Sequence, residues 1–171
     1  MKSRITKLSL AGLLILAAGR TPAQDAGTHA AEVRAIQDNE ARWNREFEAR
    51  DLEKVVEHYS GDATMMAPGL PAASGRDAIR AVVEQMVADS ALSLKFRTAR
   101  VEVAGSGDMG WSQGSYVMTM TDPRTGKPVT SSGSYVTVYR KEAGRWKAVS
   151  DIASPGPAPA AQASMQKETN R

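Results

Sequence analysis

The chain has 171 residues, with 22 Lys and Arg against 19 Asp and Glu, and it contains no cysteine. Its formal charge of +3 comes from residues 1–23, which hold Lys2, Arg4, Lys7 and Arg20 and no acidic residue; the rest of the chain has 18 basic against 19 acidic residues, a net charge of −1. The positive charge is therefore no argument for nucleic acid or an anionic membrane as a partner, and we expect no nucleic acid. Without cysteine the fold has to rest on packing rather than on disulfides.

Residues 1–23 have the three-part organisation of a secretory signal peptide. Basic residues precede an apolar run from Leu8 to Ala18, and Thr21-Pro22-Ala23 offers small residues for cleavage. The apolar run is shorter than a bilayer-spanning helix, although a membrane anchor or a buried first helix is the alternative. A lipoprotein would need a cysteine where Gly19 stands. We therefore expect a periplasmic or secreted protein without a stable membrane anchor.

The other end of the chain also differs from the middle. Residues 154–171 are rich in Pro and Ala and have almost no large apolar side chain, which predicts a disordered tail. The remaining residues, 29–153, have the length of one domain with one core.

Two helices are predicted at the start of this domain. Residues 29–49 form a helical stripe of side chains at three- and four-residue steps: Val33, Ile36, Glu40, Trp43 and Phe47. Asp51 is placed to cap a second helix. The face of that helix carries Leu52, Val55, Val56 and Tyr59.

A short strand and a third helix follow. The strand is predicted over 63–67 and ends at Pro68-Gly69. The helix is predicted to start at Ser74, where a capping box with Asp77 is possible. Its apolar face carries Ile79, Val82, Val83 and Met86.

After residue 90 the apolar period changes from helical to alternating. Four strands are predicted over 93–105, 110–122, 131–144 and 145–154, joined by tight turns. The alternation slips between Phe96 and Val101, which indicates a bulge. Helices followed by an antiparallel meander form an α+β arrangement.

The spacing of residues between Asp51 and Thr64 fits a family pattern, D-x7-Y-x2-D-A-T, which is followed by Gly75-Arg76-Asp77. Together with the order of elements, this pattern resembles the nuclear transport factor 2-like superfamily, in its SnoaL-like and ketosteroid-isomerase-like branch. The resemblance implies a cone-shaped α+β roll of the cystatin-like type, in which three N-terminal helices pack in a strongly curved antiparallel sheet. It also implies an apolar pocket at the open end and a homodimer formed through the outer face of the sheet.

The strand predicted at 131–144 has side chains suited to burial on both of its faces. Tyr135, Thr137 and Tyr139 alternate with Val136 and Val138, so large or apolar side chains lie on both sides. We expect one side to meet the helices and the other to meet a second copy of the chain.

The resemblance also raises the question of catalysis. Ketosteroid isomerase uses a carboxylate base on the short strand, a tyrosine on the first helix and a protonated Asp on a later strand. On this pattern the three places hold Ala67, Trp43 and Thr137. Because a methyl group cannot accept a proton, we expect the isomerase mechanism to be absent and assign no catalytic residue.

We therefore predict a pocket that binds a small apolar molecule without ketosteroid-isomerase catalysis. The predicted pocket residues are Trp43, Tyr59, Met65, Ala67, Tyr135, Thr137 and Asp151. Met65, Met66, Met86, Met118 and Met120 would give such a pocket an adaptable lining, and would serve equally well as core. The alternatives are an isomerase- or cyclase-like enzyme with Glu40 or Asp151 as the acid or base, and a homodimeric interaction module.

Four polar residues have simpler interpretations. Glu40 is expected at the edge of its stripe, in contact with water, and His58 is expected to be solvated. Asp62 is expected to bind its own turn. Asp151 could lie at the pocket mouth or cap the exit of its strand.

Two other kinds of site find little support. The letters GSGDMG at 105–110 match a dinucleotide-binding loop, but a strand pattern rather than a helix follows them, so a hairpin turn is expected. With two histidines, predicted on separate helices, and no cysteine, we expect neither a metal nor a cofactor.

Export gives the first test. We predict a mature chain that starts near Gln24, because cleavage would follow the small residues before it. The intact mass of protein secreted by a bacterial host measures this start. A full-length chain retained in the cytoplasm would contradict the prediction.

Overall fold

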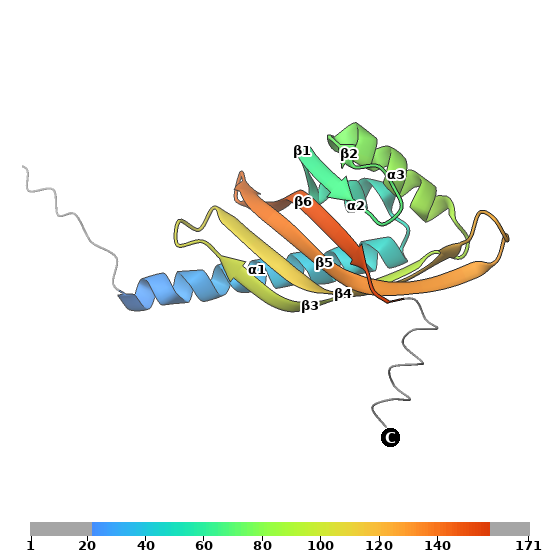
Figure 1. Ribbon diagram of the computed structural model, residues 1–171. Coiled ribbons are helices and arrows are strands. Elements are labelled where there is room, and N and C mark those ends of the chain that lie inside the picture. Colours follow the sequence, from blue (N-terminus) through green and yellow to red (C-terminus); the bar gives the residue numbers. More distant parts are fainter. Residues whose placement is uncertain (1–21, 158–171) are drawn as a thin grey trace, which may run out of the picture.

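The computed structural model describes residues 22–157, which form three helices and one curled six-stranded sheet (Figure 1). The predicted signal peptide lies outside these residues except for Pro22 and Ala23, which begin the first helix. The predicted tail also lies outside them, apart from its first four residues. Two of these, Ser154 and Pro155, belong to the last strand.

The helices are α1 (Pro22–Glu48), α2 (Leu52–Glu57) and α3 (Arg76–Ala88). Asp51 caps α2 as predicted, since its carboxylate accepts a hydrogen bond from the Lys54 amide at 3.2 Å. The capping box predicted for α3 is wrong. Gly75, rather than Ser74, occupies the cap position, so no side chain bonds the first turn. The φ of 83° at this position is a backbone conformation that glycine adopts more readily than other residues.

The strands are β1 (Tyr59–Met66), β2 (Ala73–Ser74), β3 (Ser93–Val103), β4 (Met109–Thr121), β5 (Pro128–Glu142) and β6 (Arg145–Pro155), in the sheet order β2-β1-β6-β5-β4-β3. The four-strand meander is confirmed, and the predicted bulge lies between Thr98 and Arg100. β2 was not predicted, because a strand of two residues is too short to show an alternating pattern of apolar and polar residues.

The sheet is mixed rather than antiparallel throughout. β1 runs parallel to β6, with Met65 opposite Asp151, whereas β3 to β6 are antiparallel neighbours. A parallel pair needs a long connection, and here β2, α3 and the strands β3 to β5 lie between the two strands in the chain. This pairing brings the first strand of the domain against the last.

The core lies between α1 and the concave side of the sheet, which curls around the helix (Figure 1). α1 contributes buried Ile36, Trp43 and Phe47, and α3 contributes Ile79 and Val83. The hydrophobic stripe predicted for α1 is therefore the face of the helix that packs against the sheet.

β5 shows the alternation that the sequence predicted. Tyr135, Thr137 and Tyr139 are buried, whereas Val136 is 38% exposed. On the same outer face Val136 lies opposite Ile152 of β6, and Val138 lies opposite Trp111 of β4. These neighbours give the outer face an apolar strip across three strands.

No helix within residues 22–157 has the length and hydrophobicity needed to cross a membrane.

We predict a homodimer in solution, because the apolar strip on the outer face is left uncovered in one chain. Replacing Val136 and Val138 with Lys should yield monomers or insoluble protein. Leu70→Lys is the matched control, since Leu70 is 51% exposed but lies in the loop after β1. Light scattering at micromolar concentration is the measurement, and a monodisperse monomer of the unmutated protein would contradict the prediction.

Candidate functional site

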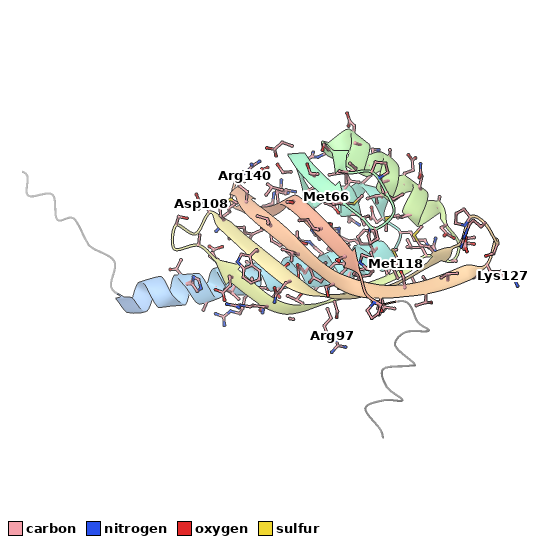
Figure 2. The ribbon with its side chains drawn as sticks, viewed as in Figure 1. Met66, Arg97, Asp108, Met118, Lys127 and Arg140 are labelled. Atoms are coloured by element: carbon pink, nitrogen blue, oxygen red, sulfur yellow. The ribbon has the colours of Figure 1, made fainter. Side chains whose placement is uncertain are left out.

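One cavity of about 100 Å³ opens between α1, α3 and the concave side of the sheet. All seven residues predicted from the sequence line it: Trp43, Tyr59, Met65, Ala67, Tyr135, Thr137 and Asp151. The same cavity is lined by Met66, Met86 and Met118 but not by Met120. Met66 and Met118 are labelled in Figure 2, on β1 and β4. The volume exceeds what a single water molecule needs.

The strand register explains why residues far apart in the sequence meet here. Met65 of β1 lies opposite Asp151 of β6, and Asp151 lies opposite Thr137 of β5. Tyr135 lies two residues from Thr137 and therefore points to the same side of the sheet. Trp43 reaches the cavity from α1, and Ala67 follows the end of β1.

Asp151 is half-buried and is the one carboxylate that lines the cavity within the described part of the chain. Its oxygens accept hydrogen bonds from the Tyr59 hydroxyl at 2.8 Å and from the Thr137 hydroxyl at 3.0 Å. Burial raises the pKa of Asp151 above its ordinary value, the negative charge of Glu40 adds to this, and the two hydrogen bonds oppose it. Asp151 lies within β6 and does not cap the strand's exit, which was the alternative.

Trp43 forms one wall of the cavity and is held by rings on three sides. Its ring stacks on His58 with centroids 4.8 Å apart and meets Tyr59 and Phe96 edge-on at 5.0 and 6.0 Å. The indole Nε1 is buried and has no hydrogen-bond partner among the described residues. Trp43 therefore contributes an apolar ring to the cavity wall, and its indole N–H is not exposed to a ligand.

Glu40 contradicts the expectation that it reaches water, because it is only 1% exposed. One carboxylate oxygen accepts from the hydroxyls of Tyr139, at 2.9 Å, and Ser112. The other accepts from those of Tyr135, at 3.0 Å, and Thr98. A carboxylate has about four acceptor positions, so this one is saturated. It does not line the cavity and adjoins it only through Tyr135.

Two glycines make room for the tyrosines of the site. A methyl group added to Gly114 would stand 2.0 Å from the Arg97 carbonyl oxygen and 2.7 Å from the Tyr135 ring. One added to Gly133 would stand 2.8 Å from the ring of Tyr116, which lines the cavity. Each glycine lies opposite its tyrosine on the neighbouring strand, so the missing side chain is what lets the ring lie flat on the sheet.

The buried tyrosines are fixed as donors. Burial raises the pKa of Tyr59, Tyr135 and Tyr139, and the neighbouring carboxylates raise it further: Asp151 for Tyr59, and Glu40 for the other two. Their hydroxyl protons therefore remain in place at neutral pH.

His58 was expected in solvent but is only 4% exposed. Its Nε2 lies 2.5 Å from a Glu46 carboxylate oxygen, and burial lowers the pKa of its ring. The Trp43 ring covers one face of it, which the sequence pattern of α2 alone could not show.

Asp62 lies in β1, and its carboxylate binds both locally, as expected, and across the sheet. It accepts from the Ser60 hydroxyl, two residues away, at 2.6 Å and from Arg140 of β5 at 2.8 Å. The Arg140 guanidinium, followed by the Ser60 hydroxyl, lowers the pKa of Asp62 to about 2.

The remaining expectations concern loops and metals. The GSGDMG segment forms the β3–β4 hairpin, as predicted, with Gly107 at a φ of 74°. Within residues 22–157 no three His, Cys, Asp or Glu side chains cluster in a way that could hold a metal ion.

Sequence analysis missed Phe96 and Tyr116, which line the cavity from β3 and β4. Tyr116 and Ser112 both occupy even-numbered positions of β4, which point inward. The alternating pattern of this strand could therefore have identified Tyr116 as a cavity residue. Phe96 lies just before the bulge, where the alternation of β3 changes phase.

The geometry of the fold agrees with comparison to known proteins. The SnoaL-like domain family matches residues 41–149. The chain belongs to this family. Its fold is that of nuclear transport factor 2-like proteins.

Solved structures show the same fold. A ketosteroid isomerase-like protein from Erwinia carotovora atroseptica is 23% identical, with a TM-score of 0.65, over 74% of this chain and 98% of the other. A nuclear transport factor 2-like protein with a cystatin-like fold from Novosphingobium aromaticivorans is 22% identical, with a TM-score of 0.64, over 84% and 96%. No curated protein shows significant similarity to the chain.

The Glu40 cluster gives a prediction about stability. Glu40→Gln replaces an acceptor oxygen with an NH₂ group, so two hydroxyls lose their acceptor, and the free energy of unfolding should fall by roughly 1–3 kcal/mol. Glu48→Gln is the control, because Glu48 lies on the same helix with its side chain 47% exposed. Urea denaturation measures both, and equal stability of the two variants would contradict the role assigned to Glu40.

Proposed function

We propose that this SnoaL-like protein is exported and binds a small apolar molecule, an aromatic ring or ring system with one hydroxyl or carbonyl oxygen, in the cavity beside Trp43. The observation that carries the proposal is the single carboxylate, Asp151, set into a wall of aromatic and methionine side chains. A binding site of this kind is largely apolar and has a few polar groups that fix orientation.

Asp151 can recognise a ligand oxygen in either protonation state. The ionised carboxylate accepts a hydrogen bond from a phenol, and the protonated acid donates one to a ketone. Because the pKa of Asp151 is raised, its carboxyl group changes from the protonated to the ionised form at a higher pH than an ordinary Asp does. Tyr59 and Thr137 hold the carboxylate in position from both sides.

The absence of the isomerase mechanism follows from Ala67. This residue lines the cavity at the place where the resemblance puts the general base, and its methyl group has no lone pair with which to take a proton. Thr137 stands where the family's acid would be, and its hydroxyl already donates to Asp151.

A second candidate is an isomerase- or cyclase-like enzyme with Asp151 as the acid or base. It is favoured by the raised pKa of a carboxylate on the cavity wall. Glu40 is a weaker choice for this role, since four hydroxyls occupy its oxygens. The homodimeric interaction module remains the third proposal and needs no ligand.

Titration with p-cresol and small aromatic ketones tests binding, by calorimetry or by tryptophan fluorescence. We expect saturable binding, weakened roughly tenfold or more for phenols in Asp151→Asn, because a bond to a charged acceptor is lost. Asp38→Asn is the matched control, since Asp38 is exposed on α1. Phenol affinity should rise, and ketone affinity should fall, as pH increases through the raised pKa of Asp151.

A parallel assay separates binding from catalysis. Ultraviolet-monitored isomerisation of a β,γ-enone should stay near background, because no base replaces Ala67. Turnover well above background that disappears in Asp151→Asn would favour the enzyme instead. No saturable binding of any phenol or ketone would leave only the interaction module.

A further inference from the structure

One tyrosine of the cavity wall has a hydroxyl group that no other described residue binds. The chain contains four tyrosines. Three of them, Tyr59, Tyr135 and Tyr139, donate their hydroxyl hydrogens to carboxylates of the core. The fourth, Tyr116, lines the cavity from β4 and has no hydrogen-bond partner among the described residues. Its hydroxyl group is therefore not needed to hold the fold together.

The Tyr116 hydroxyl is also within reach of a ligand. In the described part of the chain, the side-chain atoms that are both fully buried and without a partner belong to Asn39, Trp43 and His58. The oxygen of Tyr116 is therefore accessible, although the residue as a whole is only 6% exposed. Burial raises the pKa of Tyr116. The hydroxyl group thus keeps its proton at neutral pH and can donate it to an acceptor.

The strand register places this hydroxyl far from Asp151. Tyr116 lies opposite Gly133 of β5, and a methyl group added to Gly133 would stand 2.8 Å from the Tyr116 oxygen. Asp151 lies opposite Thr137, which is on the same strand as Gly133 and donates to the carboxylate at 3.0 Å. Residues 133 and 137 are separated by about 13 Å along the strand. The curl of the sheet shortens this distance for groups on its concave side (Figure 1).

The cavity between these two polar groups suits an apolar and uncharged body. A ligand that meets both groups needs two oxygens on the order of 10 Å apart, which is the length of one ring with a short para chain. The oxygen that meets Tyr116 has to accept a hydrogen bond. Among the described residues, no Lys or Arg lines the cavity. A neutral carbonyl group is therefore favoured over a carboxylate at this end.

We propose that Tyr116 is a second recognition residue of this cavity, and that the ligand is an elongated phenol with a neutral carbonyl group at the end opposite its hydroxyl. The phenol donates to Asp151, and the carbonyl oxygen accepts from Tyr116. Recognition by Tyr116 rests on the proposed function, in which Asp151 binds the phenol. It adds the length of the ligand and its second polar group.

Calorimetric titration with p-hydroxybenzylacetone and with p-butylphenol tests the role of Tyr116. The two ligands have the same phenol and the same chain length, and only the first carries a carbonyl group. We expect Tyr116→Phe to weaken the binding of p-hydroxybenzylacetone roughly fivefold or more, because one hydrogen bond is lost, and to change that of p-butylphenol by less than about twofold. An equal effect on both ligands, or none on the ketone, would overturn the proposal.

A shorter ketone checks the distance between the two polar groups. The carbonyl group of p-hydroxyacetophenone is attached directly to the ring, so it cannot reach Tyr116 while the phenol meets Asp151. Tyr116→Phe should therefore leave its affinity unchanged, and an equal loss for both ketones would contradict the proposed length. If no phenol binds the unmutated protein, or if Asp151→Asn leaves phenol binding unchanged, the proposed function fails and the role of Tyr116 fails with it.

Urea denaturation separates recognition from a structural role. Because the Tyr116 hydroxyl has no partner, Tyr116→Phe should unfold at the same urea concentration as the unmutated protein. Tyr139→Phe is the matched control, since it removes a donor from the buried Glu40 carboxylate and should unfold at a lower concentration. A midpoint of Tyr116→Phe as low as that of Tyr139→Phe would assign the hydroxyl a structural role and contradict the proposal.

Discussion

The buried carboxylate of Glu40 joins the first helix to the sheet. It lies on α1 and accepts hydroxyl donors from β3, β4 and β5, so one side chain sets the position of the helix against three strands. A buried charge without a cation is stable only when hydrogen bonds satisfy it. Here four hydroxyls do so, and two of them belong to tyrosines of β5 that each lie opposite a glycine of β4, Tyr135 opposite Gly114 and Tyr139 opposite Gly110.

The cavity beside Trp43 follows from this arrangement. Tyr135 donates to Glu40 with its hydroxyl and presents its ring to the cavity. The parallel pairing of β1 with β6 then adds Met65 and Asp151 to the same wall. Asp151 differs from Glu40 in having two donors rather than four. It therefore keeps acceptor capacity for a ligand, which is why we assign recognition to Asp151 and architecture to Glu40.

Much of the fold could be predicted from local pattern. The stripe of α1, the Asp51 cap, the alternation of β5 and the bulge in β3 are all properties of short segments, and the structure confirms them. The parallel pairing of β1 with β6 could not be read in this way, since it joins residues about ninety positions apart. The burial of Glu40 and His58 was missed for the same reason. Their partners come from strands and helices whose approach no single period reveals.

The site was predictable to a different degree. The seven predicted pocket residues line one cavity, because the resemblance carried a three-dimensional arrangement that the residues alone do not contain. What the resemblance could not supply is the state of each polar group: the saturation of Glu40, the enclosed donor of Trp43 and the raised pKa of Asp151 depend on contacts within this chain.

A crystal structure of the protein grown with saturating p-cresol tests the assignment of Asp151 most directly. The account predicts the ring in the cavity beside Trp43, with the phenolic oxygen within about 3.2 Å of an Asp151 carboxylate oxygen. An empty cavity, or a ring whose oxygen points away from Asp151, would contradict it.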